Sequence, residues 1–171
     1  LVARRQQDHC FSASTAIDFE PDHFLQMAGL ACYYNGNKSH YLYISRDKEL
    51  GKHIRVMSCL PDQTQPDVFS DTIVIPENKT VYLRVEVDYE RLLFAFRVAG
   101  SDSEWQWFPG QFDASILADE AGPQWNPNFT GAFVGMCCQD MSGAGQAADF
   151  DYFRYRQRNY LIHPDMEPIA E

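Results

Sequence analysis

The feature that most constrains the fold is a strict alternation of apolar and polar side chains between residues 80 and 98. Every second residue of TVYLRVEVD (residues 80–88) is aliphatic, and the same pattern returns in residues 91–98 after a short turn. A period of two residues is typical of a β-strand with one buried face. The two segments therefore predict an antiparallel hairpin with one face in water. The side chains predicted to face that water from the first strand are Tyr82, Arg84, Glu86 and Asp88.

Short apolar or alternating segments of this kind recur along most of the chain, separated by turn signals such as Asn35-Gly36-Asn37. About ten strands with almost no helix predict an all-β fold, an antiparallel β-sandwich over residues 10–157. Residues 1–9 are predicted to be a linker or a first edge strand, and residues 158–171 a polar tail. The further predicted strands are residues 10–19, 27–34, 40–46, 53–60, 69–75 and 105–108, and residues 114–119 form the one predicted helical turn.

Residues 129–155 are predicted to form two more strands joined by a loop rich in small residues. Both alternating sets of residues 129–138 are apolar or small, which indicates a strand covered on both faces and central in its sheet. Gly131 and Gly135 would then lie on one face of it. Glycines at such positions either make room for a bulky residue of a facing sheet or mark the close approach of another backbone or a ligand.

Charge argues against polyanionic partners, since 24 acidic residues against 14 Lys and Arg give a formal net charge of −10. No surplus of cations is present to neutralise phosphates or anionic lipids, so neither nucleic acid nor a membrane surface is an expected partner. An apolar run of 18 residues is also absent from the sequence. Five cysteines, an odd number, mostly within apolar strand patterns, favour a reducing compartment, and we expect a cytoplasmic location.

Metal or acid–base chemistry has only a weak candidate. Asp149 and Asp151 are two residues apart, and on one face of a strand they could share a cation such as calcium or raise each other's pKa. A solvated strand edge explains the pair equally well. Two carboxylates on one strand also cannot flank a scissile glycosidic bond from opposite sides, which argues against an autonomous hydrolase.

Aromatic residues are the more informative excess, at 14% of the chain. Sugars bind with flat apolar faces against aromatic rings and with hydroxyls bonded to nearby polar groups. Most aromatics at strand spacing belong to a core, but Trp125 and Phe129 flank a loop rich in Pro and Asn, where side chains often serve function. The other aromatics considered for a sugar platform are Trp105, Trp107, Tyr33, Tyr34, Tyr41 and Tyr43.

Three segments, MAGLACYYN, HYLYISRDKELGK and FTGAFVGMCCQDMSG followed by ADFDYFRY, carry a family resemblance in their order and spacing. Together they resemble the C-terminal domain of the β-xylosidases of glycoside hydrolase family 43. The opening VARRQQ is similar to the point at which that domain begins, and the similarity extends to about Arg156.

The resemblance implies a concanavalin A-like β-sandwich, of jelly-roll type, packed against a five-bladed catalytic propeller of the same polypeptide. In that family the propeller carries the catalytic carboxylates, which act with inversion and release xylose from chain ends of xylo-oligosaccharides. None of the propeller motifs is in this chain. The resemblance therefore implies an accessory domain with no catalytic residue, no hydrolytic activity of its own and no required cofactor.

The resemblance also implies a loop that reaches the propeller pocket and contributes a phenylalanine. The best match is Phe129, with Phe133 as the alternative and Trp125 beside them in the same pocket wall. Through this pocket the domain would contact a xylo-oligosaccharide. A second interpretation is an independent lectin-like carbohydrate-binding module. A surface left apolar without the propeller would favour self-association.

Overall fold

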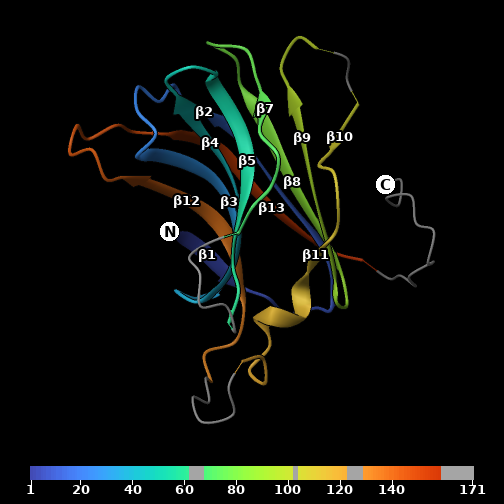
Figure 1. Ribbon diagram of the computed structural model, residues 1–171. Helices are drawn as coiled ribbons and strands as arrows, with labels where there is room; N and C mark the ends of the chain where they lie inside the picture. Colours follow the sequence, from blue (N-terminus) through green and yellow to red (C-terminus); the bar gives the residue numbers. More distant parts are fainter. Residues whose placement is uncertain (62–67, 102–103, 123–128, 159–171) are drawn as a thin grey trace.

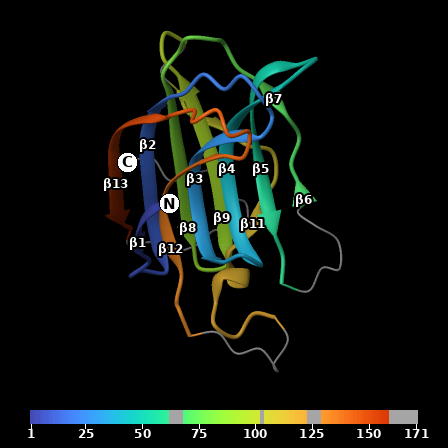
Figure 2. The same ribbon diagram turned by 90° about the vertical axis from the view of Figure 1, so that its left-hand side faces the viewer.

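The computed structural model describes residues 1–61, 68–101, 104–122 and 129–158, which form two β-sheets packed face to face (Figures 1 and 2). Sheet A has seven strands in the order β1-β12-β3-β4-β5-β6, with β7 also paired to β5. Its strands are β1 (Val2–Arg5), β3 (Gln26–Asn35), β4 (Lys38–Asp47), β5 (Gly51–Cys59), β6 (Val68–Phe69), β7 (Ile73–Val74) and β12 (Phe133–Asp140).

Sheet B has six strands in the order β10-β9-β8-β2-β13, with β11 also paired to β9. Every pairing in both sheets is antiparallel. A short 3₁₀ helix, η1 (Ala114–Leu117), lies at one end of the sandwich. The strands of sheet B are β2 (Cys10–Asp18), β8 (Val81–Asp88), β9 (Arg91–Val98), β10 (Gln106–Trp107), β11 (Phe112–Asp113) and β13 (Asp149–Gln157).

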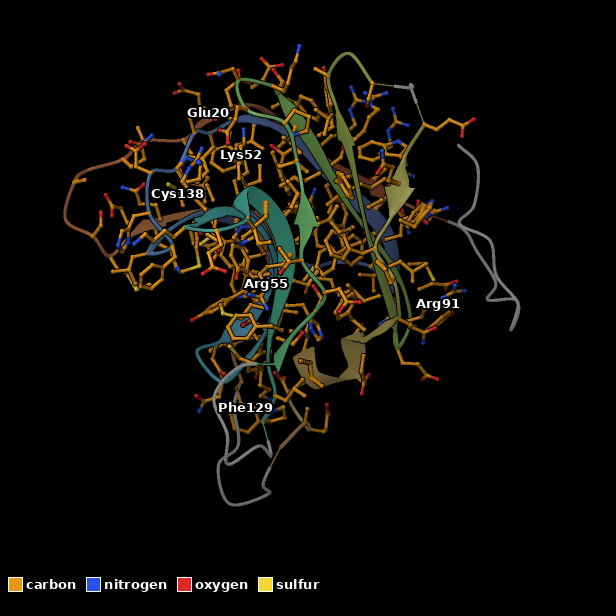
Figure 3. The ribbon with its side chains drawn as sticks, turned by 45° about the horizontal axis from the view of Figure 1, so that its top comes forward. Glu20, Lys52, Arg55, Arg91, Phe129 and Cys138 are labelled. Carbon is orange, nitrogen blue, oxygen red and sulfur yellow. The ribbon has the colours of Figure 1, made fainter. Side chains whose placement is uncertain are left out.

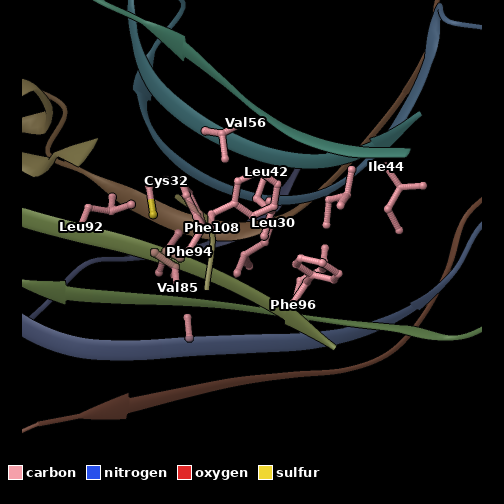
Figure 4. Packing of buried hydrophobic residues seen from close by; sticks show 14 of the residues in the cluster. Leu30, Cys32, Leu42, Ile44, Val56, Val85, Leu92, Phe94, Phe96 and Phe108 are labelled. Atoms are coloured by element: carbon pink, nitrogen blue, oxygen red, sulfur yellow. The ribbon is translucent and has the colours of Figure 1, made fainter. Parts of the chain in front are cut away.

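The core lies between the two sheets and is built from one alternating set of each long strand (Figure 4). Leu42 and Ile44 of β4, for example, face Val85 of β8 and Phe94 of β9, and all four are fully buried. Burying an aliphatic or aromatic side chain contributes about 1.5–3 kcal/mol. The period-two patterns of the sequence are therefore the direct source of the sandwich, and the predicted all-β fold is confirmed.

Most predicted strands appear within a few residues of their expected bounds, and residues 2–5 are an edge strand of sheet A. Three details differ. The predicted strand over residues 69–75 is two short strands, β6 and β7, paired with successive parts of β5. The predicted hairpin from residue 129 begins its first strand only at Phe133, and this strand, β12, has only β1 between it and the sheet edge.

Gly131 and Gly135 do not share one strand face, contrary to the prediction. Gly131 precedes β12 and has φ +69°, a left-handed conformation that glycine adopts without strain. Gly135 lies in β12 beside Ala3 of β1, and a Cβ there would collide with the β1 backbone. Of the two interpretations, the close approach of another backbone is the right one for Gly135.

The outward face of β8 is also not wet, contrary to the prediction for this hairpin. Arg84 and Glu86 are each only 6% exposed, and their side chains form an ion pair of 2.6 Å. Arg158 forms a second ion pair with Glu86, and the Arg84 guanidinium lies 5.5 Å from the ring centroid of Trp105. Side chains from distant parts of the sequence thus cover a face that the local pattern assigns to solvent.

Glu86→Ala should lower the free energy of unfolding by about 3 kcal/mol, because it removes the shared carboxylate of two poorly exposed guanidinium groups. Urea denaturation measures the change. The control is Glu90→Ala, a carboxylate at the exposed turn after β8, which should cost less than about 0.5 kcal/mol. Equal losses for the two variants would show that the buried pairs add no stability.

Candidate functional site

The candidate site lies at the end of the sandwich where Phe129 projects from the polypeptide (Figure 3). Phe129 is 84% exposed, the highest value among large hydrophobic side chains in the described residues. It precedes β12 and belongs to no strand. A ring so exposed has no role in the core of the described residues, which makes Phe129 available for a contact outside them.

The backbone beside Phe129 is held by two side chains from distant strands. The Tyr34 hydroxyl, at the end of β3, accepts a hydrogen bond of 3.2 Å from the Thr130 N–H and donates one to the Asp119 carboxylate. The Arg5 guanidinium, at the end of β1, donates to the Thr130 carbonyl. Both polar groups of the Thr130 peptide backbone are therefore bonded, which fixes the point from which Phe129 projects.

Lys38 also belongs to this network and lies against the ring of Tyr34. Its ammonium group lies 4.1 Å from the ring centroid and donates a 2.8 Å hydrogen bond to the Ala118 carbonyl just after η1. A desolvated cation over an aromatic face contributes about 1–2 kcal/mol. Lys38 therefore contacts one face of the Tyr34 ring, and the Tyr34 hydroxyl bonds to Asp119 and to the Thr130 N–H.

His40 joins η1 to sheet A at the same end. Its Nδ1 lies 2.7 Å from the Ser58 hydroxyl oxygen and its Nε2 lies 2.9 Å from the Asp113 carbonyl oxygen. Burial lowers the pKa of His40, so the ring is neutral at pH 7. Because a carbonyl only accepts, Nε2 carries the proton and Nδ1 accepts from Ser58. The side chain of Asp113 in turn caps η1 by accepting from the Ser115 N–H at 2.9 Å.

The predicted pocket residues Phe129 and Phe133 differ in their surroundings. Phe133 is the first residue of β12, half-buried, with the Arg5 guanidinium 4.7 Å from its ring centroid. It helps to position the segment rather than projecting from it. Trp125 lies outside the described residues. Arg5, Lys38 and Asp119 were not predicted, because only the fold brings the ends of β1 and β4 and the turn after η1 together.

Within the part of the chain that the structure describes, the two weak metal candidates belong to no group of three or more potential ligands. Asp149 and Asp151 are both exposed in β13. A bulge between Phe150 and Tyr152 falls at Asp151 and interrupts the alternation on which the prediction of a shared face rests. Within the described residues, no three His, Cys, Asp or Glu side chains gather into a potential metal site. Calcium binding remains a prediction that no observation tests.

Two further observations concern the predicted environment of the chain. The cysteines Cys10, Cys32, Cys59, Cys137 and Cys138 are all free thiols. Burial raises the pKa of Cys32 to about 12, so this side chain is an uncharged part of the core. Among the described residues no helix has the length and apolar character needed to cross a bilayer.

Comparison with known families identifies the chain. Residues 1–156 match the family described as the β-xylosidase C-terminal concanavalin A-like domain, of glycoside hydrolase family 43. The chain belongs to this family. The match covers both sheets of the sandwich and the segment that carries Phe129.

Relatives of this β-xylosidase C-terminal domain are much longer than the chain. A putative β-xylosidase of Escherichia coli (strain K12) and a β-xylosidase of Bacillus subtilis (strain 168) are each 38% identical to it, over 90% and 92% of its length. The chain spans only 28% and 29% of these two proteins. In a crystal structure of xylan β-1,4-xylosidase from Bacillus halodurans, 34% identical, the TM-score is 0.84 over 91% of this chain and 29% of that one. The β-xylosidase C-terminal domain is therefore one part of larger proteins in its relatives.

Tyr34→Phe should release the backbone beside Phe129. The Thr130 amide loses its acceptor, so its hydrogen exchange should accelerate at least tenfold, while global stability falls by about 1 kcal/mol. The control is Tyr41→Phe, which removes a 2.9 Å hydrogen bond from the tyrosine hydroxyl to the Cys137 carbonyl elsewhere in sheet A. Accelerated Thr130 exchange in both variants would mean that Tyr34 does not hold this segment specifically.

Proposed function

We propose that this chain is the accessory domain of a β-xylosidase, which packs on a catalytic propeller of the same polypeptide and helps to close its xylose-binding pocket. Phe129 is the residue that enters this pocket. The supporting observation is a ring that is 84% exposed yet projects from a backbone held at both polar groups. Preorganisation of this kind reduces the entropy lost when a partner is bound.

The partner follows from the lengths of the relatives. Their similarity to this chain covers less than a third of each protein, so the remaining part is large enough for a catalytic domain. In our proposal that part supplies every catalytic carboxylate, and this chain supplies none. A ring at the pocket mouth would exclude water and block passage of a long polymer, which suits release of single sugars from chain ends of xylo-oligosaccharides.

The surroundings of Phe129 suit a contact between domains. Arg5, Tyr34 and Lys38 seal the sandwich behind the ring, so a docking propeller would meet a rigid surface. Five free thiols agree with the proposed cytoplasmic location. Exposed apolar side chains at Leu1, Val2 and Phe129 also agree with the proposed self-association of the isolated chain.

The test is a chimera in which this chain replaces the matching region of the Bacillus subtilis β-xylosidase. Phe129→Ala should lower kcat/KM for an aryl β-xyloside roughly tenfold, since the ring shields the bound sugar from water. Unfolding of the sandwich should not change. The control is Leu50→Ala, an exposed apolar side chain in the turn between β4 and β5 at the opposite end, which should leave kcat/KM unchanged.

Two outcomes would contradict the proposal. The first is unchanged kinetics of the Phe129→Ala chimera, which would remove the ring from the pocket. The second is hydrolysis of the aryl β-xyloside by the 171-residue chain alone, which would place catalytic groups in the sandwich. An independent binding module predicts a third pattern, in which deleting the whole domain from the chimera leaves hydrolysis of small substrates intact.

A further inference from the structure

The outer face of sheet A carries a groove of about 540 Å³ that the proposed pocket closure does not use. It lies over β3, β4 and β5, and its lining residue Arg55 is labelled in Figure 3. Its lining is mixed. Phe24, Phe69 and Met141 give apolar walls, while Asp47, His53 and Arg55 give polar groups.

Tyr43 lines the groove and lies beside small residues that alternate on the outer face of β3. Gly29 pairs with Tyr43, and Ala31 pairs with Tyr41. The two tyrosine rings, with centroids 5.3 Å apart, pack in a cluster with Met27 and Ala31, and each tyrosine is only 4% exposed.

Two of the walls come from the segments that follow β2 and β12 (Figure 1). Phe24 lies in the connection between β2 and β3, and Met141 follows β12. The Asp140 carboxylate accepts hydrogen bonds of 2.8 Å from the N–H groups of Ser142 and Gln146, which orders the loop that carries Met141. Hydrogen bonds from the Ser142 hydroxyl and from these N–H groups lower the pKa of Asp140 to about 2. One wall is thus preformed without a ligand.

The third wall joins the apolar and polar parts of the groove. Phe69 in β6 is 47% exposed, and the Arg55 guanidinium lies 4.4 Å from its ring centroid. The buried Nε of Arg55 has no hydrogen-bond partner among the described residues. The Arg55 Nη2 donates a long 3.4 Å hydrogen bond to the Ser70 carbonyl, and the Arg55 side chain also lines the groove.

Asp47 and His53 can accept hydrogen bonds from hydroxyl groups of a ligand in the groove. The Oδ1 atom of Asp47 accepts from the N–H groups of Glu49 and Leu50, at 2.7 and 3.0 Å, and Asp47 also lines the groove. His53 is 5% exposed, and its Nδ1 donates to the Gly51 carbonyl at 3.1 Å. Burial lowers the pKa of His53, so its Nε2 is an acceptor at pH 7.

We propose that this groove binds an uncharged pyranose oligosaccharide. Rings at the rim suit the apolar faces of a sugar, and a carboxylate, a neutral imidazole and a guanidinium below them suit its hydroxyls. The one negative and one positive charge balance, which disfavours an anionic ligand. Because the polar groups are recessed, a small ligand that can enter the groove is favoured, and a partner protein with a flat surface is not.

The first experiment titrates the ¹⁵N-labelled 171-residue chain with xylohexaose and, separately, with cellohexaose, and follows backbone amide shifts. We expect saturable shifts at residues of β4, β5 and the β12–β13 loop with at least one of the two sugars. Absence of saturable shifts with both sugars up to 10 mM, a limit on the order of weak millimolar affinity, would overturn the proposal. Shifts confined to another surface would overturn it as well.

Variants then locate the binding. Phe69→Ala removes a half-exposed ring and should weaken the affinity about tenfold. Asp47→Asn keeps the acceptor for Glu49 and Leu50 but removes the charge that faces the ligand, and it should weaken binding severalfold with the turn intact. Circular dichroism checks that both variants are folded.

The matched control is Tyr89→Asn, which removes an exposed ring from the β8–β9 turn of sheet B. Tyr89 has φ +54°, a conformation that asparagine tolerates well, so the turn should persist. Its affinity for the sugar should equal that of the unaltered chain. Equal weakening by Tyr89→Asn and Phe69→Ala, or no weakening by Phe69→Ala and Asp47→Asn, would contradict a site in this groove.

Discussion

Burial of aliphatic and aromatic side chains between the two sheets is the interaction on which the rest of the structure depends. Because side chains alternate along a strand, the burial of Leu42 and Ile44 places Tyr43 on the opposite face of β4. In β5, burial of Ile54 and Val56 likewise turns Arg55 outward. The outer groove on sheet A is therefore a consequence of the core, and its polar groups are placed by strand register rather than by loops.

At the two ends of the sandwich, residues that point inward meet water and polar backbone groups, so apolar side chains alone cannot fill these positions. At the end with η1 the solution is Lys38, whose cation lies over Tyr34 and bonds to a carbonyl. At the other end Lys52, with a fully buried side chain, pairs with Glu20 at 2.5 Å (Figure 3). Tyr34, whose ring contacts Lys38, also accepts a hydrogen bond from the Thr130 N–H. The position of the proposed pocket residue Phe129 therefore depends on these contacts at the end of the sandwich.

Local patterns in the sequence were enough to predict the strands and the sandwich, because alternation and turn residues act over a few positions. They were not enough for the outward face of β8, where Glu86 is covered through pairing with Arg158, far along the chain. They also could not show that Arg5 and Tyr34 meet at Thr130. The prediction of Phe129 as a pocket residue rests on family resemblance and its loop context, whereas the residues that hold the backbone beside it depend on tertiary contacts.

The edge strand β1 has a mechanical consequence. Its four residues pair in register with β12, and the Gln6 N–H extends the ladder to the Ala132 carbonyl at 2.8 Å. Close backbone approach at Gly135 leaves little room for the strand to slide. The β1 strand is therefore held firmly against β12. Tension on β1 would be transmitted through β12 to the backbone beside Phe129, so an edge strand of sheet A is mechanically coupled to the proposed pocket residue.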